Sequence, residues 1–286
     1  MSDHRRGLLI TTIGVLCIVP DASLVRAIDA STLTTIMWRS ALVGLSASIW
    51  FIARRGRELP AILRAMGPPG IAVGVLWGAG TMLFVAAVDN TSIGNAVLIL
   101  ASSPIWAALL DRFVLGRSIP RRTMVAIPIA LVGVGIAFGS SAGGGRLTGD
   151  LIALVASMLL AVNFTVLRRY QDRDLTAAPP VAFLIAAAAL FLAGVEPGLE
   201  PGDLVPVLVL GLLVIPVAMV LITTGAQLLS PPETALLLLL ETVLSPLLGA
   251  VVVDEAIPTA TLVGGILVVV TLGGHALATL TSTQDF

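Results

Sequence analysis

The sequence predicts an all-α integral membrane protein with ten transmembrane helices, arranged as two inverted five-helix repeats around a central cavity. Hydrophobic residues make up 57% of the 286 residues and charged residues only 12%, which is too little polar surface for a soluble chain. The apolar residues fall into separate blocks of roughly 20 residues, each long enough to cross a bilayer. The second half of the chain also resembles the first, which is typical of transporters.

In the first half, charged residues or helix breakers bound each apolar segment. The first segment follows Arg5 and Arg6, and we expect a membrane helix there rather than a cleaved signal peptide, because nine more segments follow. The second ends at the run 54–57, the third at Asp89, and Pro120 opens the fifth. The expected spans are 7–27, 32–53, 68–88, 92–114 and 122–140.

In the second half, the same signals separate five further segments. A glycine run at 143–145 precedes the sixth, the charged stretch 172–174 separates it from the seventh, and 196–198 (Glu-Pro-Gly) separates the seventh from the eighth. Two prolines open the ninth segment, and Pro258 opens the tenth. The expected spans are 149–169, 178–195, 204–226, 232–253 and 258–280.

Arginine placement predicts the orientation. All sixteen basic residues are arginine, and thirteen of them fall on one side if the N-terminus is placed in the cytoplasm. Ten spans then put both termini in the cytoplasm. The arginine runs are therefore topology signals rather than a nucleic-acid patch, and the net charge of −1 indicates no polyanionic partner.

An internal repeat organises the chain. Residues 92–135 align without a gap onto 230–273, and the pair Ile119-Pro120 meets Ile257-Pro258. Because five helices is an odd number, the second copy enters the membrane inverted. We expect two repeats, at 1–141 and 146–286, with a binding site near the midplane between them.

Motifs in both halves then indicate a family. In the second half, Glu241 lies fourteen residues before Glu255, and Pro258 follows; in the first half Pro104 stands at the matching position, and Arg39 lies in the second span. With this pattern the chain resembles the drug/metabolite transporter superfamily, of the EamA type, and most of all the YddG-type exporters of aromatic amino acids. It departs from the usual Glu-Pro and Gly-Glu pairs by having Thr242 and Asp254.

Polar residues inside apolar spans are expensive and usually line a cavity or pair with one another. Glu241 is the sharpest case, either as a contact for a substrate ammonium or as a proton-coupling carboxyl, and otherwise as a packing group. Aromatic and hydroxyl side chains share a face of the third span. Pro104 either kinks the fourth span and opens a backbone carbonyl to substrate, or it is part of plain helix geometry. The expected substrate contacts are Trp77, Thr81, Asn95, Ser102, Asn163 and Glu241.

Two further charges have open interpretations. Asp21, which follows Pro20 near the end of the first span, is either a gate or a loop carboxylate. Arg39 is expected to pair with an acid at the outer surface rather than to bind substrate. With no arginine expected near the midplane, phosphorylated substrates are disfavoured.

Missing motifs exclude several chemistries. The chain has no GxxxxGK[ST], no HExxH and no Cys/His cluster, so we expect no ATP-driven motor, no metal and no cofactor, and we expect no enzyme activity. The resemblance implies a secondary transporter in the bacterial inner membrane that exports aromatic and other neutral amino acids by alternating access. The partners would be the amino acid and the lipid bilayer, with a monomer expected. Two alternatives stay open: a proton-coupled exporter of drugs or cationic metabolites, and a membrane scaffold.

Overall fold

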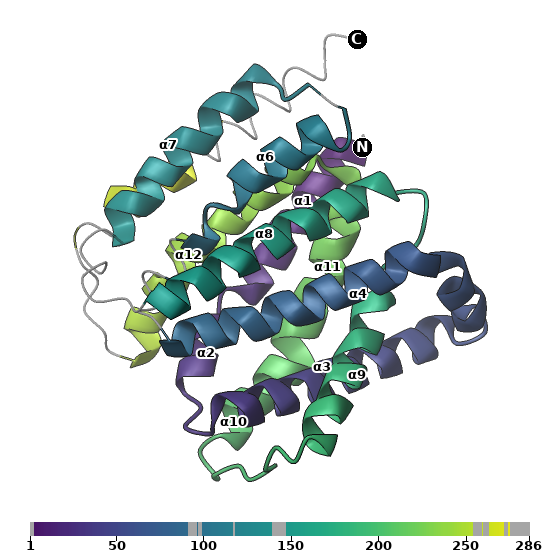
Figure 1. Cartoon of the computed structure of the whole chain (residues 1–286). Helices are drawn as coiled ribbons and strands as arrows, with labels where there is room; N and C mark the ends of the chain where they lie inside the picture. The colour runs from purple at the N-terminus through teal and green to yellow at the C-terminus, as the bar shows by residue number, and fades with distance from the viewer. Residues whose placement is uncertain are drawn as a thin grey trace.

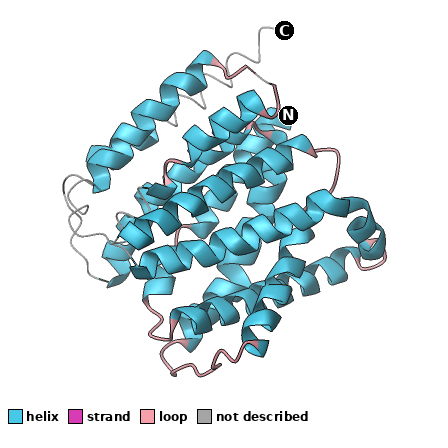
Figure 2. Cartoon of the chain, viewed as in Figure 1, coloured by secondary structure: helices cyan, strands magenta, loops and turns pink. Residues whose placement is uncertain are grey.

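The structure is a computed structural model that describes residues 3–90, 96, 99–116, 118–138, 147–253, 259, 263–271 and 274. Within these residues the regular elements are all helices, joined by short loops (Figure 2). In chain order they are α1 (Asp3–Ile18), α2 (Asp21–Arg26), α3 (Thr32–Arg55), α4 (Leu59–Asn90), α6 (Ser103–Phe113), α7 (Arg121–Phe138), α8 (Leu147–Arg169), α9 (Ala178–Leu192), α10 (Leu204–Val209), the π-helix η1 (Leu210–Val214), α11 (Ile215–Leu228) and α12 (Pro231–Val253). Residues 263–271 are also helical.

Five helical segments of the described residues are long and apolar enough to cross a membrane. They are Asp3–Val25, Thr32–Arg55, Leu59–Ala87, Leu147–Arg169 and Leu204–Leu228. Ala178–Leu192 is a shorter apolar helix. Their outward faces carry large apolar side chains such as Ile71, Leu192 and Val205, as expected of surfaces that contact lipid.

The helix contacts follow a paired pattern. If the chain is divided between α7 and α8, the third spanning helix of each half lies along the first spanning helix of the other half. Thus α4 runs beside α8 and α1 beside α11, as Figure 1 shows for α4 and α8. The second spanning helices, α3 and α9, contact each other, and so do the fourth ones, α6 and α12. Every one of these contacts joins the two halves of the chain.

Small residues let these helices approach closely, as is common in membranes. A Cβ added at Gly225 of α11 would lie 2.1 Å from Thr11 Oγ1 of α1, and one at Gly14 would lie 2.9 Å from Leu221 Cβ. In α4, a Cβ added at Gly74 would lie 2.9 Å from Ala178 O of α9, whereas one at Gly78 would meet no atom of the described residues within 4 Å. Helix α4 therefore packs closely at Gly74 and not at Gly78.

Proline and glycine explain the two irregular helices. Gly67 has φ +54° and divides α4 just before two prolines. Pro69 has no N–H for the carbonyl of Ala65, and this oxygen accepts a hydrogen bond from Arg173 Nη1 at 3.4 Å.

The π-helix η1 has a similar origin. Pro216 cannot donate to Gly211, whose carbonyl would accept the i+5 N–H of a π-helix, and Ser46 Oγ of α3 donates to it at 3.0 Å. A Cβ at Gly211 would lie 2.3 Å from Leu42 Cβ, so only glycine allows η1 to lie this close to α3.

Some expected spans are interrupted. The span 7–27 is divided by a turn at residues 19–20, and 178–195 ends as a helix at Leu192. The expected continuous helix 92–114 is wrong, because α6 begins only at Ser103 after a turn at residues 101–102. Pro104 lies in the first turn of α6, where a missing N–H does no harm, rather than at a kink inside a longer helix. The tenth span is described as a helix at 263–271, where it packs against Gly133 of α7.

Candidate functional site

A buried ion pair lies inside the bundle. Arg39 Nη2 of α3 donates to Asp21 Oδ2 of α2 at 2.7 Å, and both side chains are only 4% exposed. The turn at residues 19–20 ends α1, so that Asp21 opens α2 beside α3. Arg39 was expected to pair with an acid at the outer surface. It does pair with an acid, but the surface position is wrong, because Arg39 lies two helical turns inside α3.

This pair has unused hydrogen-bonding capacity. Within the described residues, Asp21 Oδ1, Arg39 Nε and Arg39 Nη1 are buried and have no hydrogen-bond partner. A buried donor or acceptor without a partner costs about 1–3 kcal/mol, so native structures rarely retain one without a reason. The pair is therefore a candidate binding element rather than a fully satisfied structural bridge.

Glu241 lies near this pair. It is the eleventh residue of α12, about 15 Å from the start of that helix at 1.5 Å per residue, and hence near the middle of a membrane-length helix. Helices α12 and α2 are in contact, and Glu241 is close enough for the charges of Asp21 and Arg39 to act on it. We call Asp21, Arg39 and Glu241 the interior charge cluster.

Two other expected contacts have buried polar atoms that lack a partner within the described part of the chain. Trp77 of α4 has a buried indole Nε1, and Asn163 of α8 is 2% exposed with a buried Oδ1. The two belong to helices that lie side by side but to different halves of the chain. Thr81 lies one turn beyond Trp77 and is partly buried.

Ser102 has protein partners. Its Oγ lies 3.0 Å from Ser157 Oγ of α8, and Trp106 Nε1 donates to it at 3.2 Å. These bonds link α6 to α8, so Ser102 joins two helices whether or not it also meets a substrate. Asn95 lies outside the described residues.

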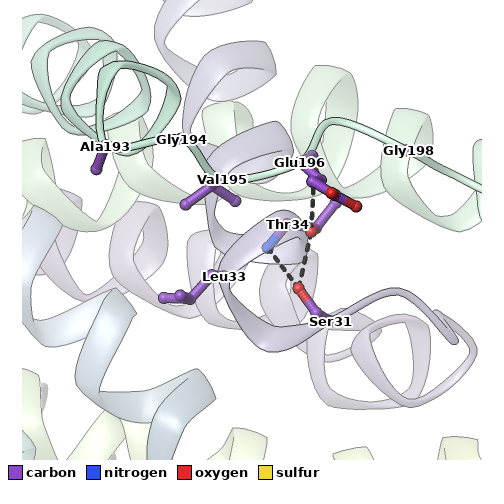
Figure 3. Close-up of a pocket in the computed structure, with 8 residues that line it drawn as sticks. All are labelled: Ser31, Leu33, Thr34, Ala193, Gly194, Val195, Glu196 and Gly198. Carbon is purple, nitrogen blue, oxygen red and sulfur yellow. Dashed lines mark hydrogen bonds between the residues drawn. The ribbon is translucent and has the colours of Figure 1, made fainter.

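A cavity of about 480 Å³ opens between the first turn of α3 and the loop that follows α9 (Figure 3). Ser31 Oγ caps α3, and Thr34 Oγ1 donates to the carbonyl of Glu196 at 3.0 Å across the cavity wall. None of the five expected contacts that fall within the described residues lines this cavity. Its lining residues are Ser31, Leu33, Thr34, Ala193, Gly194, Val195, Glu196 and Gly198.

The opposite end of α3 carries a different set of charges, which we call the arginine-rich end. Arg55 pairs with Asp174, in the loop after α8, and with Glu58. Burial raises the pKa of Asp174, but hydrogen bonds from Thr176 and Arg55 outweigh it, so the pKa lies below its ordinary value of 3.8. Arg55 and Asp174 are 39% and 32% exposed, so this pair is hydrated, unlike that of Arg39.

At the same end, α11 and α12 are tied to their neighbours. Gln227 Nε2 donates to the carbonyl of Arg173 at 2.7 Å, and Arg168 Nη1 donates to that of Gln227 at 2.8 Å. His4 of α1 lies 3.3 Å from Glu233, which caps α12 through Ser230. The first and second halves of the chain are thus also linked at the arginine-rich end.

The sequence did not identify the interior charge cluster as a unit. Asp21 and Arg39 were each considered singly, and Glu241 was placed with aromatic and amide residues instead. The available signal was that three ionisable residues fall inside expected spans of an otherwise apolar chain, where such groups pair with one another.

Comparison with known proteins identifies the family. The model of the EamA-like transporter family matches twice, at residues 7–139 and 147–274, which is nearly the whole chain. A solved structure described as "Crystal structure of protein" is similar with a TM-score of 0.81 and 20% identity, over 96% of this chain and 98% of that one, which shows a common fold. No curated protein matches. The chain belongs to the EamA-like transporter family and is a multi-pass membrane transporter of the drug/metabolite type.

Proposed function

We propose that this transporter exports aromatic and other neutral amino acids across the bacterial inner membrane by alternating access. The two repeats, 1–141 and 146–286, would be inverted relative to each other, with both termini in the cytoplasm. The paired contacts of α1 with α11 and of α4 with α8 support this arrangement, because a pseudo-two-fold axis would exchange them. Export and the amino-acid class come from the family resemblance.

The observation that carries the proposal is the set of polar groups, buried at Asn163 and partly buried at Trp77 and Glu241, on helices of both halves. Trp77, Asn163 and Glu241 lie well inside α4, α8 and α12, and the first two have buried atoms without a partner in the described part of the chain. Such groups are costly in a membrane. A polar substrate that binds between the helices would provide their missing hydrogen-bond partners. Trp77 would cover an aromatic or aliphatic side chain, and Glu241 would receive the ammonium group. Thr81, Asn95 and Ser102 complete the proposed contact set.

Exchange in proteoliposomes tests this function. Vesicles that contain the purified chain and unlabelled L-phenylalanine are diluted into labelled L-phenylalanine, and the uptake of label is followed. We expect saturable uptake that unlabelled neutral amino acids compete away, and none in protein-free vesicles. Uptake equal to that of protein-free vesicles, across a panel of amino acids, would overturn the amino-acid assignment.

A second candidate function is a proton-coupled exporter of cationic metabolites or drugs. The excess of acid over base in the interior charge cluster favours it, because a cation would be attracted there. In the same vesicles, movement of an organic cation that depends strictly on a pH gradient, without exchange of amino acids, would select this function.

A further inference from the structure

We propose that the interior charge cluster is a binding site for one positive charge, and that a proton and the ammonium group of the substrate compete for it. The proton half of this proposal stands on the cluster alone. The substrate half rests on the proposed function.

The charge balance of the cluster is the first argument. Arg39 stays protonated under all ordinary conditions, so the cluster holds one fixed positive charge and two carboxyl groups. With both carboxylates ionised it would carry one net negative charge inside an apolar bundle, which is costly. One additional positive charge makes the cluster neutral. Because Asp21 already has a direct bond to Arg39, Glu241 is the carboxylate without a guanidinium of its own.

The second argument is the unused capacity of the ion pair. Asp21 and Arg39 are more than nine-tenths buried, yet Asp21 Oδ1, Arg39 Nε and Arg39 Nη1 have no partner within the described residues. A purely structural pair in a native interior normally has its remaining bonds satisfied by protein groups or by ordered water. A ligand that carries an ammonium group would satisfy Asp21 Oδ1 and the Glu241 carboxylate, and an adjacent carboxylate would accept from Arg39.

The third argument is the isolation of the cluster from other ionisable groups. Helices α9, α10, η1 and α11, which pack against α2, α3 or α12, have no ionisable side chain. Cys17 of α1 lies one turn before Asp21. The other charged residues of the neighbouring elements lie near helix ends or before the kink of α4: Asp3, His4, Arg5, Arg6, Arg26, Arg54, Arg55, Arg64, Asp89, Asp111, Arg112, Arg121, Arg122, Asp150, Arg168, Arg169 and Glu233. The proton balance of the cluster is therefore set within it.

Charge-neutralising variants test the proton half. The full-length protein in lipid nanodiscs is titrated through the neutral pH range, and protonated carboxyl groups are counted by their infrared C=O band. We expect one such group in the wild type. Asp21→Asn should abolish it, because Arg39 then neutralises Glu241, and Glu241→Gln should also abolish it. Arg39→Gln should give two, and the double variant Asp21→Asn/Arg39→Gln should restore one.

Asp21→Asn decides the proton half, since it preserves the shape of the side chain and tests coupling rather than folding. If Asp21→Asn keeps the band of the wild type, Glu241 is protonated on account of its burial alone and the cluster is not a unit. If the band survives in Glu241→Gln, the exchangeable proton is elsewhere. A size-exclusion profile for each variant restricts the count to folded protein, and either result overturns the proposal even if Arg39→Gln does not fold.

Proton release on ligand binding tests the substrate half. In a weakly buffered solution with a pH dye, L-phenylalanine and phenethylamine should each release about one proton per bound molecule, and 3-phenylpropionate, which lacks the ammonium group, should release none. Asp21→Asn should bind without release. Binding of L-phenylalanine to the wild type without release would overturn the competition. If L-phenylalanine does not bind at all, the proposed function fails, while the infrared count still decides the proton half.

Discussion

Two arginines of the same helix, Arg39 and Arg55, each pair with an aspartate in opposite surroundings. The Arg55–Asp174 pair is about one-third exposed and lies at the arginine-rich end, whereas the Arg39–Asp21 pair is 4% exposed and lies inside the bundle. A hydrated ion pair contributes little to the free energy of unfolding, typically about 0–1 kcal/mol, so its removal has a small effect. A buried ion pair requires desolvation of both ions, and removal of one partner leaves the other charge buried without compensation. The comparison teaches that stability does not explain why the chain has the buried Arg39–Asp21 pair. We assign this pair a role in transport.

The largest expected effect is that of Arg39→Gln. It leaves the carboxyl groups of Asp21 and Glu241 in the bundle without a counter-charge, and we expect a loss of about 3–5 kcal/mol in the free energy of unfolding. The double variant Asp21→Asn/Arg39→Gln should recover much of this loss. Thermal unfolding in detergent, followed by tryptophan fluorescence, gives the comparison. Equal losses for the single and double variants would mean that shape rather than charge holds this region together.

A smaller effect is expected from Gly211→Ala, which changes the packing around the interior pair without touching a charge. The new Cβ would lie 2.3 Å from Leu42 Cβ, which must shift with α3, and η1 also contacts α2. Overpacking of this kind costs about 1–3 kcal/mol. Gly78→Ala is the matched control, since its Cβ would meet no atom within 4 Å in the described part of the chain, and it should be neutral or slightly stabilising. Similar melting temperatures for the two variants would argue against the close fit of η1 on α3.

Trp77→Ala tests a neutral group of the interior. We expect stronger loss of exchange for phenylalanine and leucine than for alanine or glycine, by about tenfold if the ring contributes about 1.4 kcal/mol of contact to bulky side chains. Trp77→Phe keeps a ring and should largely retain the preference. The measurement is the rate of exchange for each amino acid in vesicles of equal protein content. A uniform loss across the series would place Trp77 at a helix interface rather than against substrate.

The smallest effect is expected at the hydrated pair. Asp174→Asn should lower the free energy of unfolding by about 1 kcal/mol or less. Because the pKa of Asp174 in the folded protein lies below its ordinary value, its contribution is full above about pH 4 and is lost as the pH falls through the folded value. The wild type should therefore have a higher melting temperature than the variant at neutral pH, and the difference should disappear below about pH 4. A difference that stays constant down to strongly acidic pH would show that the carboxylate charge is not what stabilises this loop.

The sequence predicted most of the described helices because lipid imposes a simple rule on length and polarity. The starts of α8, α9 and α12 fall within about two residues of the expected spans, since charges and prolines mark them. The break before α6 was missed because a proline in the first turn of a helix and one at a kink leave the same local pattern.

The interior pair was missed for a different physical reason. Which acid an arginine meets depends on how two distant helices pack, and no local rule gives the partner of Arg39 eighteen residues away. The expectation that no arginine lies near the midplane stays a prediction, because Arg39, although buried, lies only two turns from the start of the 24-residue helix α3. The prediction that phosphorylated substrates are disfavoured is consistent with the structure, because Asp21 already neutralises the guanidinium of Arg39. The expected roles of Trp77, Thr81, Asn163 and Glu241 stay predictions.

The comparison of the two arginines gives the most direct test of the account. Exchange of labelled L-phenylalanine is measured in vesicles that contain equal amounts of folded Arg39→Gln or Arg55→Gln protein, with the wild type as reference. We predict that Arg39→Gln loses at least about tenfold in rate, as expected for a buried charge contact of 2–5 kcal/mol, while Arg55→Gln stays close to the wild type. Equal rates for the two variants would contradict a role of the interior charge cluster in transport.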